Sequence, residues 1–169
     1  MEDLCKRLAR DLDAAFPELV REMQAPLYSG LRRLHGTDAE DLTQEAFIRA
    51  YNALAGYDPD RVRTLSLRGW MWTIAMNLGR NALRDRARRP IPAEFDDPTT
   101  CDPEPPDTAS WDRRLATLSK PQRDAIVLRH VVGLTIAETS QALGRPEGTV
   151  KADVHRGLEK LRTIMEAEQ

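Results

Sequence analysis

A run of prolines and acids near the middle of the chain limits the possible folds more than any other feature of this 169-residue sequence. Residues 90–110 contain six of the eleven prolines and six carboxylates, and they contain no basic side chain. Proline fixes φ and removes a backbone donor, so this segment is not expected to lie inside a helix or a sheet. Like charges extend it further. We therefore expect a semi-rigid linker between two folded units.

The segments on both sides of this linker have helical periodicity. In residues 16–34 the apolar side chains recur at intervals of three and four, with Pro26 inside the pattern. Residues 37–40 have the pattern of a capping box that starts a second helix. A third long helix is expected from Trp70 to residue 89. The alternation that is typical of a strand is not evident in the sequence.

A helix-turn-helix pattern follows the linker. A capping signal at residues 119–122 starts a helix that is expected to end at Gly133. Residues 135–143 then predict a short helix that stops at Gly144, and a longer helix starts at Pro146. A short helix, a turn that contains glycine and a longer helix together are typical of the helix-turn-helix.

These patterns predict an all-α fold with two small helical domains. The domains are expected at residues 1–89 and 111–169, joined by the acidic, proline-rich linker at residues 90–110. The net charge of −2 hides a segregation, because the two domains carry +2 each (15 basic and 13 acidic; 10 basic and 8 acidic) and the linker carries −6. The overall charge therefore does not exclude a nucleic-acid partner.

Several other classes of protein are excluded. No apolar run approaches the roughly 20 residues of a membrane-spanning helix, and the acidic N-terminus does not resemble a secretory signal. Cys5 and Cys101 are isolated and form neither a disulfide framework nor a metal motif, which favours the cytoplasm. The three histidines are scattered. We expect no catalytic residue, no metal, no cofactor, no small-molecule substrate and no membrane insertion.

The helix expected at residues 70–89 has two distinct faces. Apolar side chains gather on one face, and the opposite face carries Thr73, Asn77, Arg80, Arg84 and Arg88. Arginines four residues apart repeat about every 6 Å and can follow successive phosphates. Trp70, at the edge of this face, is suited to stack on an unstacked base. The alternative is a solvated cationic face with Trp70 as a half-buried lid.

The last helix has the features of a recognition helix. Its inward positions are expected to be Val150, Val154, Leu158 and Leu161, and its outward arc Gly148, Ala152, His155, Arg156 and Glu159, flanked by Thr149 and Lys151. The first turns of such a helix reach base edges in the major groove. Asp153 is expected on the opposite flank, where it repels phosphate unless it pairs with Arg145 or Arg156. An ordinary helical pair with an exposed polar face is the alternative.

Two longer motifs resemble a known family. Residues 38–51 and 68–77 are similar to conserved region 2 of bacterial sigma factors, and residues 118–134 with 148–151 and 155–156 are similar to region 4. Because the regions between them are missing, the chain resembles the compact extracytoplasmic-function (ECF) group, group IV of the sigma-70 family. The resemblance implies a dissociable promoter-specificity subunit that binds core RNA polymerase and promoter DNA, makes and breaks no bond, and is controlled by an anti-sigma factor.

The resemblance also assigns roles to three sets of residues. The set that docks on the clamp helices of the largest polymerase subunit is Asp41, Gln44 and Glu45. The set that opens and reads the −10 element is Arg63, Arg68, Trp70, Asn77, Arg80, Arg84 and Arg88. The set that reads the −35 element is Thr149, Lys151, Ala152, His155 and Arg156. The linker matches the acidic connector that family members lay in the catalytic cleft and RNA path.

The chain departs from the family pattern in region 4. Thr139 and Ser140 stand where an apolar residue and alanine are usual, so their hydroxyls need backbone acceptors. Ala152 and Asp153 stand where Ser-Arg is frequent, which implies an altered −35 sequence or a weakened contact. Two other functions stay open. One is a sigma-like decoy that titrates an anti-sigma factor without opening promoters, and the other is a stand-alone helix-turn-helix repressor.

Overall fold

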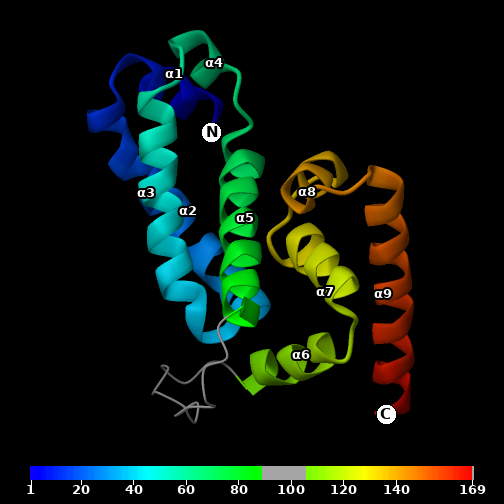
Figure 1. Ribbon diagram of the computed structural model, residues 1–169. Coiled ribbons are helices and arrows are strands. Elements are labelled where there is room, and N and C mark those ends of the chain that lie inside the picture. The colour runs from blue at the N-terminus through cyan, green and yellow to red at the C-terminus, as the bar shows by residue number, and fades with distance from the viewer. Residues whose placement is uncertain (89–105, 169) are drawn as a thin grey trace.

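The computed structural model describes residues 1–88 and 106–168, and every regular element in these two ranges is helical (Figure 1). The first range, here the first lobe, holds α1 (Glu2–Arg10), α2 (Leu12–His35), the 3-10 turn η1 (Gly36–Asp38), α3 (Ala39–Ala55), α4 (Pro59–Arg63) and α5 (Leu67–Arg88). The second range, the second lobe, holds α6 (Pro106–Ala116), α7 (Lys120–Ile126), the π-helical turn η2 (Val127–Val131), α8 (Ile136–Leu143) and α9 (Glu147–Ala167). The all-α prediction is confirmed. No helix in the described ranges is both long and apolar enough to cross a membrane.

The expected linker lies mostly outside the described residues. Its last five residues are the exception, because α6 begins at Pro106 and not after residue 110. A proline is accepted at the first helical position, where its missing N–H has no partner within the helix. The expectation that residues 90–110 form no helix is therefore wrong for residues 106–110.

The first lobe is built around α2. Asp11 caps this helix by accepting a backbone N–H at 3.1 Å, and Gly36, with a φ of 61°, ends it. Leu27 and Leu31 of α2 are fully buried, and the helix packs against both α3 and α5. The cap at Asp11 starts the helix at Leu12, four residues before the segment whose periodicity indicated it.

Two further features of the first lobe differ from expectation. The separate helix α1 packs against α2 and α4, and it buries Leu4, Cys5 and Leu8. The helix α3 follows a 3-10 turn and has Asp38 as its N-cap, in place of the box predicted at residues 37–40. Such a turn satisfies part of a helix end through backbone bonds, so the side-chain box is not required there.

The helix-turn-helix prediction is confirmed in the second lobe. Thr135 and Glu138 form the capping box of α8, with the Thr135 N–H donating to Glu138 Oε2 at 2.8 Å and the Glu138 N–H donating to Thr135 Oγ1 at 3.2 Å. Gly144 ends α8 in the left-handed conformation that favours glycine. The buried hydroxyl of Thr139 donates to the carbonyl of Thr135 at 2.8 Å. This bond supplies the backbone acceptor that its burial requires.

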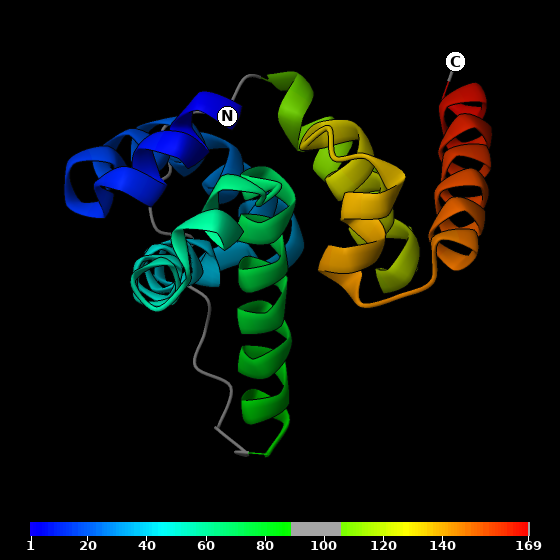
Figure 2. The same ribbon diagram turned by 90° about the horizontal axis from the view of Figure 1, so that it is seen from above.

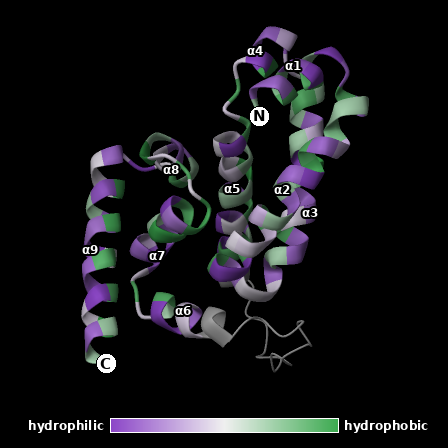
Figure 3. Ribbon diagram, turned by 180° about the vertical axis from the view of Figure 1, so that it is seen from behind, coloured by the Kyte–Doolittle hydropathy of each residue, from purple (hydrophilic) through white to green (hydrophobic). Residues whose placement is uncertain are grey.

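The buried face of α9 differs from the predicted one. It consists of Val150, Asp153, Gly157 and Leu161, whereas Leu158 is 42% exposed. A Cβ at Gly157 would lie only 2.5 Å from Ile126 Cδ1, so α7 approaches α9 at this glycine. Because of this close approach, the buried positions 153 and 157 lie one residue before the predicted positions 154 and 158. The apolar residues of α9 gather on the side toward α7 (Figure 3).

The two lobes pack directly against each other. The helix α5 has α2 and α3 on one side and α8 on the other, while α9 lies on the outer side of the second lobe (Figures 1 and 2). Gly30 of α2 lies where this helix packs against both α5 and the second lobe. A Cβ there would lie 2.5 Å from Cη2 of the fully buried Trp72 and 3.1 Å from Cγ2 of Val132 in the second lobe.

This packing makes the effect of a methyl group at Gly30 predictable. We expect Gly30→Ala to lower the free energy of unfolding by about 1–2 kcal/mol, because displacing a buried indole outweighs the gain in helix propensity. Gly148→Ala is the matched control, since its Cβ would meet no described atom within 4 Å. It should raise the free energy of unfolding by about 0.5 kcal/mol. Urea denaturation of both variants measures the difference, and equal shifts would contradict the packing.

Candidate nucleic-acid interface

The three residues assigned to polymerase docking share the polar side of α3. Asp41 and Gln44 are exposed and Glu45 is half-buried, while Leu42 and Ala46 of the same helix are buried in the core. Gln44 Nε2 donates to Glu40 Oε1 at 3.4 Å, and Glu45 pairs with Arg49 at 2.7 Å. These contacts lie within one helix, so the set is presented to solvent from a rigid support.

One apolar side chain extends this docking surface. Ile48 is 57% exposed, and it lies one turn beyond Glu45 on the same face of α3. An exposed isoleucine beside carboxylates is suited to a partner surface that is part apolar and part basic. The sequence analysis missed it. Its spacing of three and four residues from the other members of the docking set was the available signal.

The residues assigned to the −10 element divide into two groups. Arg63 and Arg84 are exposed; Arg63 pairs with Asp60, and Arg84 Nη2 donates to Asn81 Oδ1 at 3.3 Å. Arg88 is the last residue of α5. Trp70 is half-buried and packs against the core. Its ring centroid lies 6.1 Å from that of Tyr57.

Arg68, Asn77 and Arg80 form the second group, in which Arg68 is half-buried, Asn77 and Arg80 are exposed, and the two arginines bond to the second lobe. Arg80 Nη1 donates to the carbonyl oxygens of Leu143 at 2.9 Å and Ala142 at 3.3 Å, at the C-terminal end of α8. Its other terminal nitrogen donates to Asn77, and Arg68 donates to the carbonyl of Val132. A cation at the last carbonyls of a helix is favoured by the helix dipole. Two of the predicted DNA readers therefore hold the lobes together in this conformation.

A third contact between the lobes involves the capping glutamate of α8. Ser66 Oγ donates to Glu138 Oε1 at 2.6 Å, while Oε2 of the same carboxylate serves the cap of α8. These hydrogen bonds and the nearby Arg68 lower the pKa of Glu138 although its partial burial opposes them. The helices approach so closely here that a Cβ at Gly69 would lie 2.8 Å from Glu138 Cγ. No local sequence pattern indicated this contact.

The residues assigned to the −35 element lie on the outer side of α9. Thr149, Lys151, His155 and Arg156 are exposed, and Ala152 is half-buried. Lys151 pairs loosely with Glu147 at 3.8 Å, and His155 lies 3.4 Å from Glu159. Surface pairs of this kind contribute little to stability, so these side chains are available to a ligand. These residues therefore form a surface, and Asp153, which was expected on the opposite flank, is 5% exposed and faces inward.

His35 is a mostly buried histidine at the end of α2. Burial lowers its pKa below the ordinary value of 6.5, and nearby Lys120 lowers it further, while Asp124 opposes the shift. Its Nε2 has no hydrogen-bond partner within the described residues. A Cβ at Gly79 would lie 2.3 Å from this nitrogen, so His35 packs tightly against α5.

A pH dependence follows from the lowered pKa of His35. Below pH 6.5 the unfolded chain binds more protons than the folded one, so the free energy of unfolding should fall as the pH falls. We expect His35→Gln to reduce the slope of the urea midpoint between pH 7.5 and pH 5.5. A residual slope should persist, since burial also lowers the pKa of His130. The exposed His155→Gln is the control, and an identical reduction in both variants would rule out His35 as the source.

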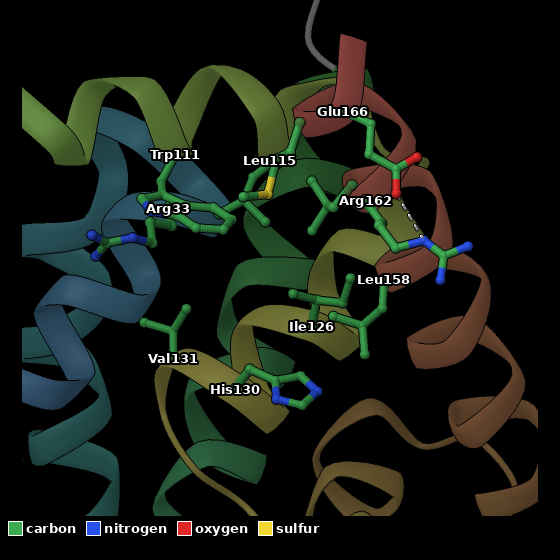
Figure 4. A pocket seen from close by; sticks show the side chains of 11 residues that line it. Arg33, Trp111, Leu115, Ile126, His130, Val131, Leu158, Arg162 and Glu166 are labelled. Carbon is green, nitrogen blue, oxygen red and sulfur yellow. Dashed lines mark ion pairs between the residues drawn. The ribbon is translucent and has the colours of Figure 1, made fainter. Parts of the chain in front are cut away.

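An apolar groove lies on the second lobe between α6, α7, η2 and α9 (Figure 4). Its volume is about 660 Å³, and Arg33 of α2 closes one side. Trp111, Val131 and Leu158 at the groove are 38%, 46% and 42% exposed. Large apolar side chains gathered at one exposed site are typical of a binding surface for another protein. Sequence analysis missed the groove because it placed Leu158 in the core.

Comparison with known proteins assigns each lobe to a family. The family model described as Sigma-70 region 2 matches residues 19–89, and that described as Sigma-70, region 4 matches residues 108–161. The ECF RNA polymerase sigma factor SigE of Mycolicibacterium smegmatis is 35% identical over 90% of this chain, which spans 63% of that protein. The RNA polymerase sigma-E factor of Streptomyces avermitilis is 34% identical, over 90% of this chain and 86% of that protein.

Solved structures have the same fold. The structure of CnrH in complex with the cytosolic domain of CnrY matches with a TM-score of 0.72 and 26% identity, over 99% of this chain and 98% of that one. The sigma factor RpoE of Bartonella quintana, in complex with the anti-sigma factor NepR, matches with a TM-score of 0.75 and 22% identity, over 91% and 98%. With both conserved regions in the family's order and relatives over nearly its whole length, this chain belongs to the ECF sigma factors of the sigma-70 family.

Proposed function

We propose that this chain binds core RNA polymerase and directs initiation at promoters that have −10 and −35 elements. The observation that carries the proposal is the polar docking set on the outer side of α3, on the same lobe as the arginine face of α5 and beside a helix-turn-helix. In this mechanism Asp41, Gln44 and Glu45 dock on the clamp helices of the largest subunit. The α5 face opens and reads the −10 element, and α9 reads the −35 element. The factor itself makes and breaks no bond.

Promoter binding in this mechanism requires the lobes to separate. Arg80 Nη1 donates to two carbonyls of α8 in this conformation, so it becomes free for a DNA phosphate only when the lobes separate. Two promoter elements about one and a half helical turns apart are roughly 50–55 Å from each other. We infer that polymerase holds the two lobes apart, and that the linker predicted at residues 90–110 spans the distance along the RNA path.

We infer that an anti-sigma factor controls this chain in the cytoplasm. The supporting likeness is that RpoE was solved with the anti-sigma factor NepR and that CnrH was solved with the cytosolic domain of CnrY. The supporting feature in this chain is the exposed apolar surface of the groove on the second lobe. A protein that covers the groove and bridges to α2 would keep the lobes together and withhold Arg80 from DNA.

The direct test is run-off transcription with purified core polymerase. A matched template comes from mapping transcript starts after overexpression, since the shared upstream motifs report both DNA-reading surfaces. We expect a start-specific product that depends on the added chain and on both elements. A chain that neither migrates with core polymerase nor yields this product, after any inhibitor has been removed, is not an initiation factor.

The sigma-like decoy gains no support from the comparisons, since the relatives reported above are named as sigma factors. The exposed Arg84 also argues against a decoy, because a protein that only titrates an inhibitor needs no phosphate contact. The stand-alone repressor does not account for a first lobe that matches region 2. Tight promoter binding without polymerase would favour the repressor over the initiation factor.

A further inference from the structure

Two departures from the family pattern meet at one residue. Ser140 Oγ donates to the carbonyl of Arg145 at 2.6 Å, and the Arg145 N–H donates to the carbonyl of Ser140 at 3.1 Å. The side chain of Arg145 reaches Asp153, with Nη2 lying 2.5 Å from Oδ2. Arg145 is therefore fixed at its backbone by Ser140 and at its guanidinium by Asp153. It lies in the turn directly before α9, which begins at Glu147.

Asp153 is covered by the two arginines that it holds. Its side chain is 7% exposed, and its Oδ1 accepts a hydrogen bond from Arg156 Nη2 at 3.0 Å. The Arg145 side chain is 29% exposed and the Arg156 side chain 60%. A molecule that approaches this end of α9 therefore meets guanidinium groups and not the carboxylate. The cluster of two cations and one anion carries a net charge of +1.

The contact with Arg145 differs in kind from the contact with Arg156. Arg156 donates a well-aligned hydrogen bond to Oδ1, whereas Oδ2 is in close ion-pair contact with Arg145 but accepts no aligned hydrogen bond from the described residues. In a buried site with a reduced dielectric constant, such a charge pair restricts the guanidinium even without alignment. The remaining N–H donors of Arg145 are free to turn toward an anion beside the helix.

We propose that Arg145 is a further DNA-contact residue, which binds a backbone phosphate at the edge of the −35 element, and that Asp153 is the positioning residue for Arg145 and Arg156. The proposal rests on the proposed function and names a recognition residue that the family pattern did not assign. Backbone phosphate is the expected target. A recognition helix enters the major groove with its N-terminal residues, so the turn directly before it lies beside the DNA backbone that borders the groove. Asp153 then positions the two arginines that face DNA and does not itself repel DNA.

The first experiment uses holoenzyme assembled from core polymerase and the full chain, bound to the mapped promoter at several salt concentrations. For Arg145→Ala we expect about tenfold weaker binding and a salt slope smaller by about one, to the same extent for every −35 sequence. Arg162→Ala is the matched control. It removes the same charge from α9, the helix that follows Arg145, but its partner is Glu166 near the C-terminus. It should change neither quantity.

The second experiment uses Asp153→Asn, which keeps the shape of the side chain and removes its charge. A positioning role predicts weaker promoter binding, because both arginines lose their anchor. A merely repulsive carboxylate predicts tighter binding, so the sign of the change decides. In the Arg145→Ala background the effect of Asp153→Asn should be smaller, since one of the two anchored arginines is already gone. Thermal unfolding by circular dichroism identifies a variant that fails to fold, and Arg145→Ala then decides alone.

The outcomes separate the two levels of inference. If the unchanged chain binds no core polymerase and gives no start-specific transcript, the proposed function fails. If it transcribes while Arg145→Ala binds like Arg162→Ala, or while Asp153→Asn binds more tightly, only this inference is overturned. A loss confined to one −35 sequence would show that Arg145 contacts a base, and it would overturn the phosphate assignment.

Discussion

Lysine at both Asp41 and Glu45 is expected to weaken association with core polymerase by about 100-fold or more. Removing charges that are paired and covered in a protein interface costs 2–5 kcal/mol, and reversal adds repulsion. Folding should be almost unaffected. Asp41 is exposed, and Glu45 loses only a surface pair with Arg49, of the kind that contributes about 0–1 kcal/mol. Fluorescence anisotropy of labelled chain titrated with core polymerase measures the affinity.

A matched pair of charge reversals lies on the neighbouring helix. Glu2→Lys and Asp3→Lys change the charge by the same amount on α1, where both side chains are more than 80% exposed and pair only within the helix. This control should bind core polymerase like the unchanged chain. If both double variants lose affinity equally, the effect comes from net charge, and α3 is not the docking surface.

Arg84→Ala is expected to lower the yield of open complex by about tenfold without changing the affinity for core polymerase. Losing a hydrogen bond to a charged group such as phosphate costs about 1.5–3 kcal/mol, and the salt slope of promoter binding should fall by about one. In this conformation the Arg84 guanidinium donates to Asn81 of the same helix, so the substitution leaves the lobe packing intact. Permanganate reactivity of thymines at the −10 element measures strand opening. Arg21→Ala, an exposed arginine on α2, is the control.

Arg80→Ala tests two opposing effects on the yield of open complex. It removes a predicted DNA contact, but it also removes the two hydrogen bonds to the carbonyls of α8 that hold the lobes together. We expect a smaller net loss of open complex than for Arg84→Ala, because easier separation of the lobes offsets part of the lost DNA contact. A loss equal to or larger than that of Arg84→Ala would mean that the closed arrangement opposes promoter binding very little.

The helices that have strong local signals were predictable from sequence. The capping box from Thr135 to Glu138 and the left-handed Gly144 delimit α8 as expected, because both signals act within one turn. The exposed Thr149 and Lys151 were likewise recovered by helical periodicity alone. Arrangements that depend on a second element were not. Gly157 lets Ile126 approach α9, and this shifts the inner face so that Leu158 becomes exposed.

The contact between the lobes was the feature that sequence patterns predicted least. Arg80 was correctly placed on the polar face of α5, and Arg68 was expected in the loop before that helix, but their partners are backbone carbonyls more than 60 positions away. Any residue presents a backbone carbonyl, so no side-chain pattern marks such an acceptor. Asp153 was similar. The possibility of pairing with Arg145 or Arg156 was visible in the sequence, whereas its burial depended on how α9 meets the rest of the second lobe.

Under the proposed function, the hydrogen bonds from Arg80 to the end of α8 set how much of the factor is needed to start transcription. When the lobes of most molecules are packed together, only the fraction with separated lobes binds a promoter. The apparent dissociation constant is then the intrinsic constant divided by that fraction. Each hydrogen bond between the lobes therefore raises the amount of factor that is needed to start transcription of a gene. Evolution can adjust how readily such a regulon responds by changing residues that touch neither polymerase nor DNA.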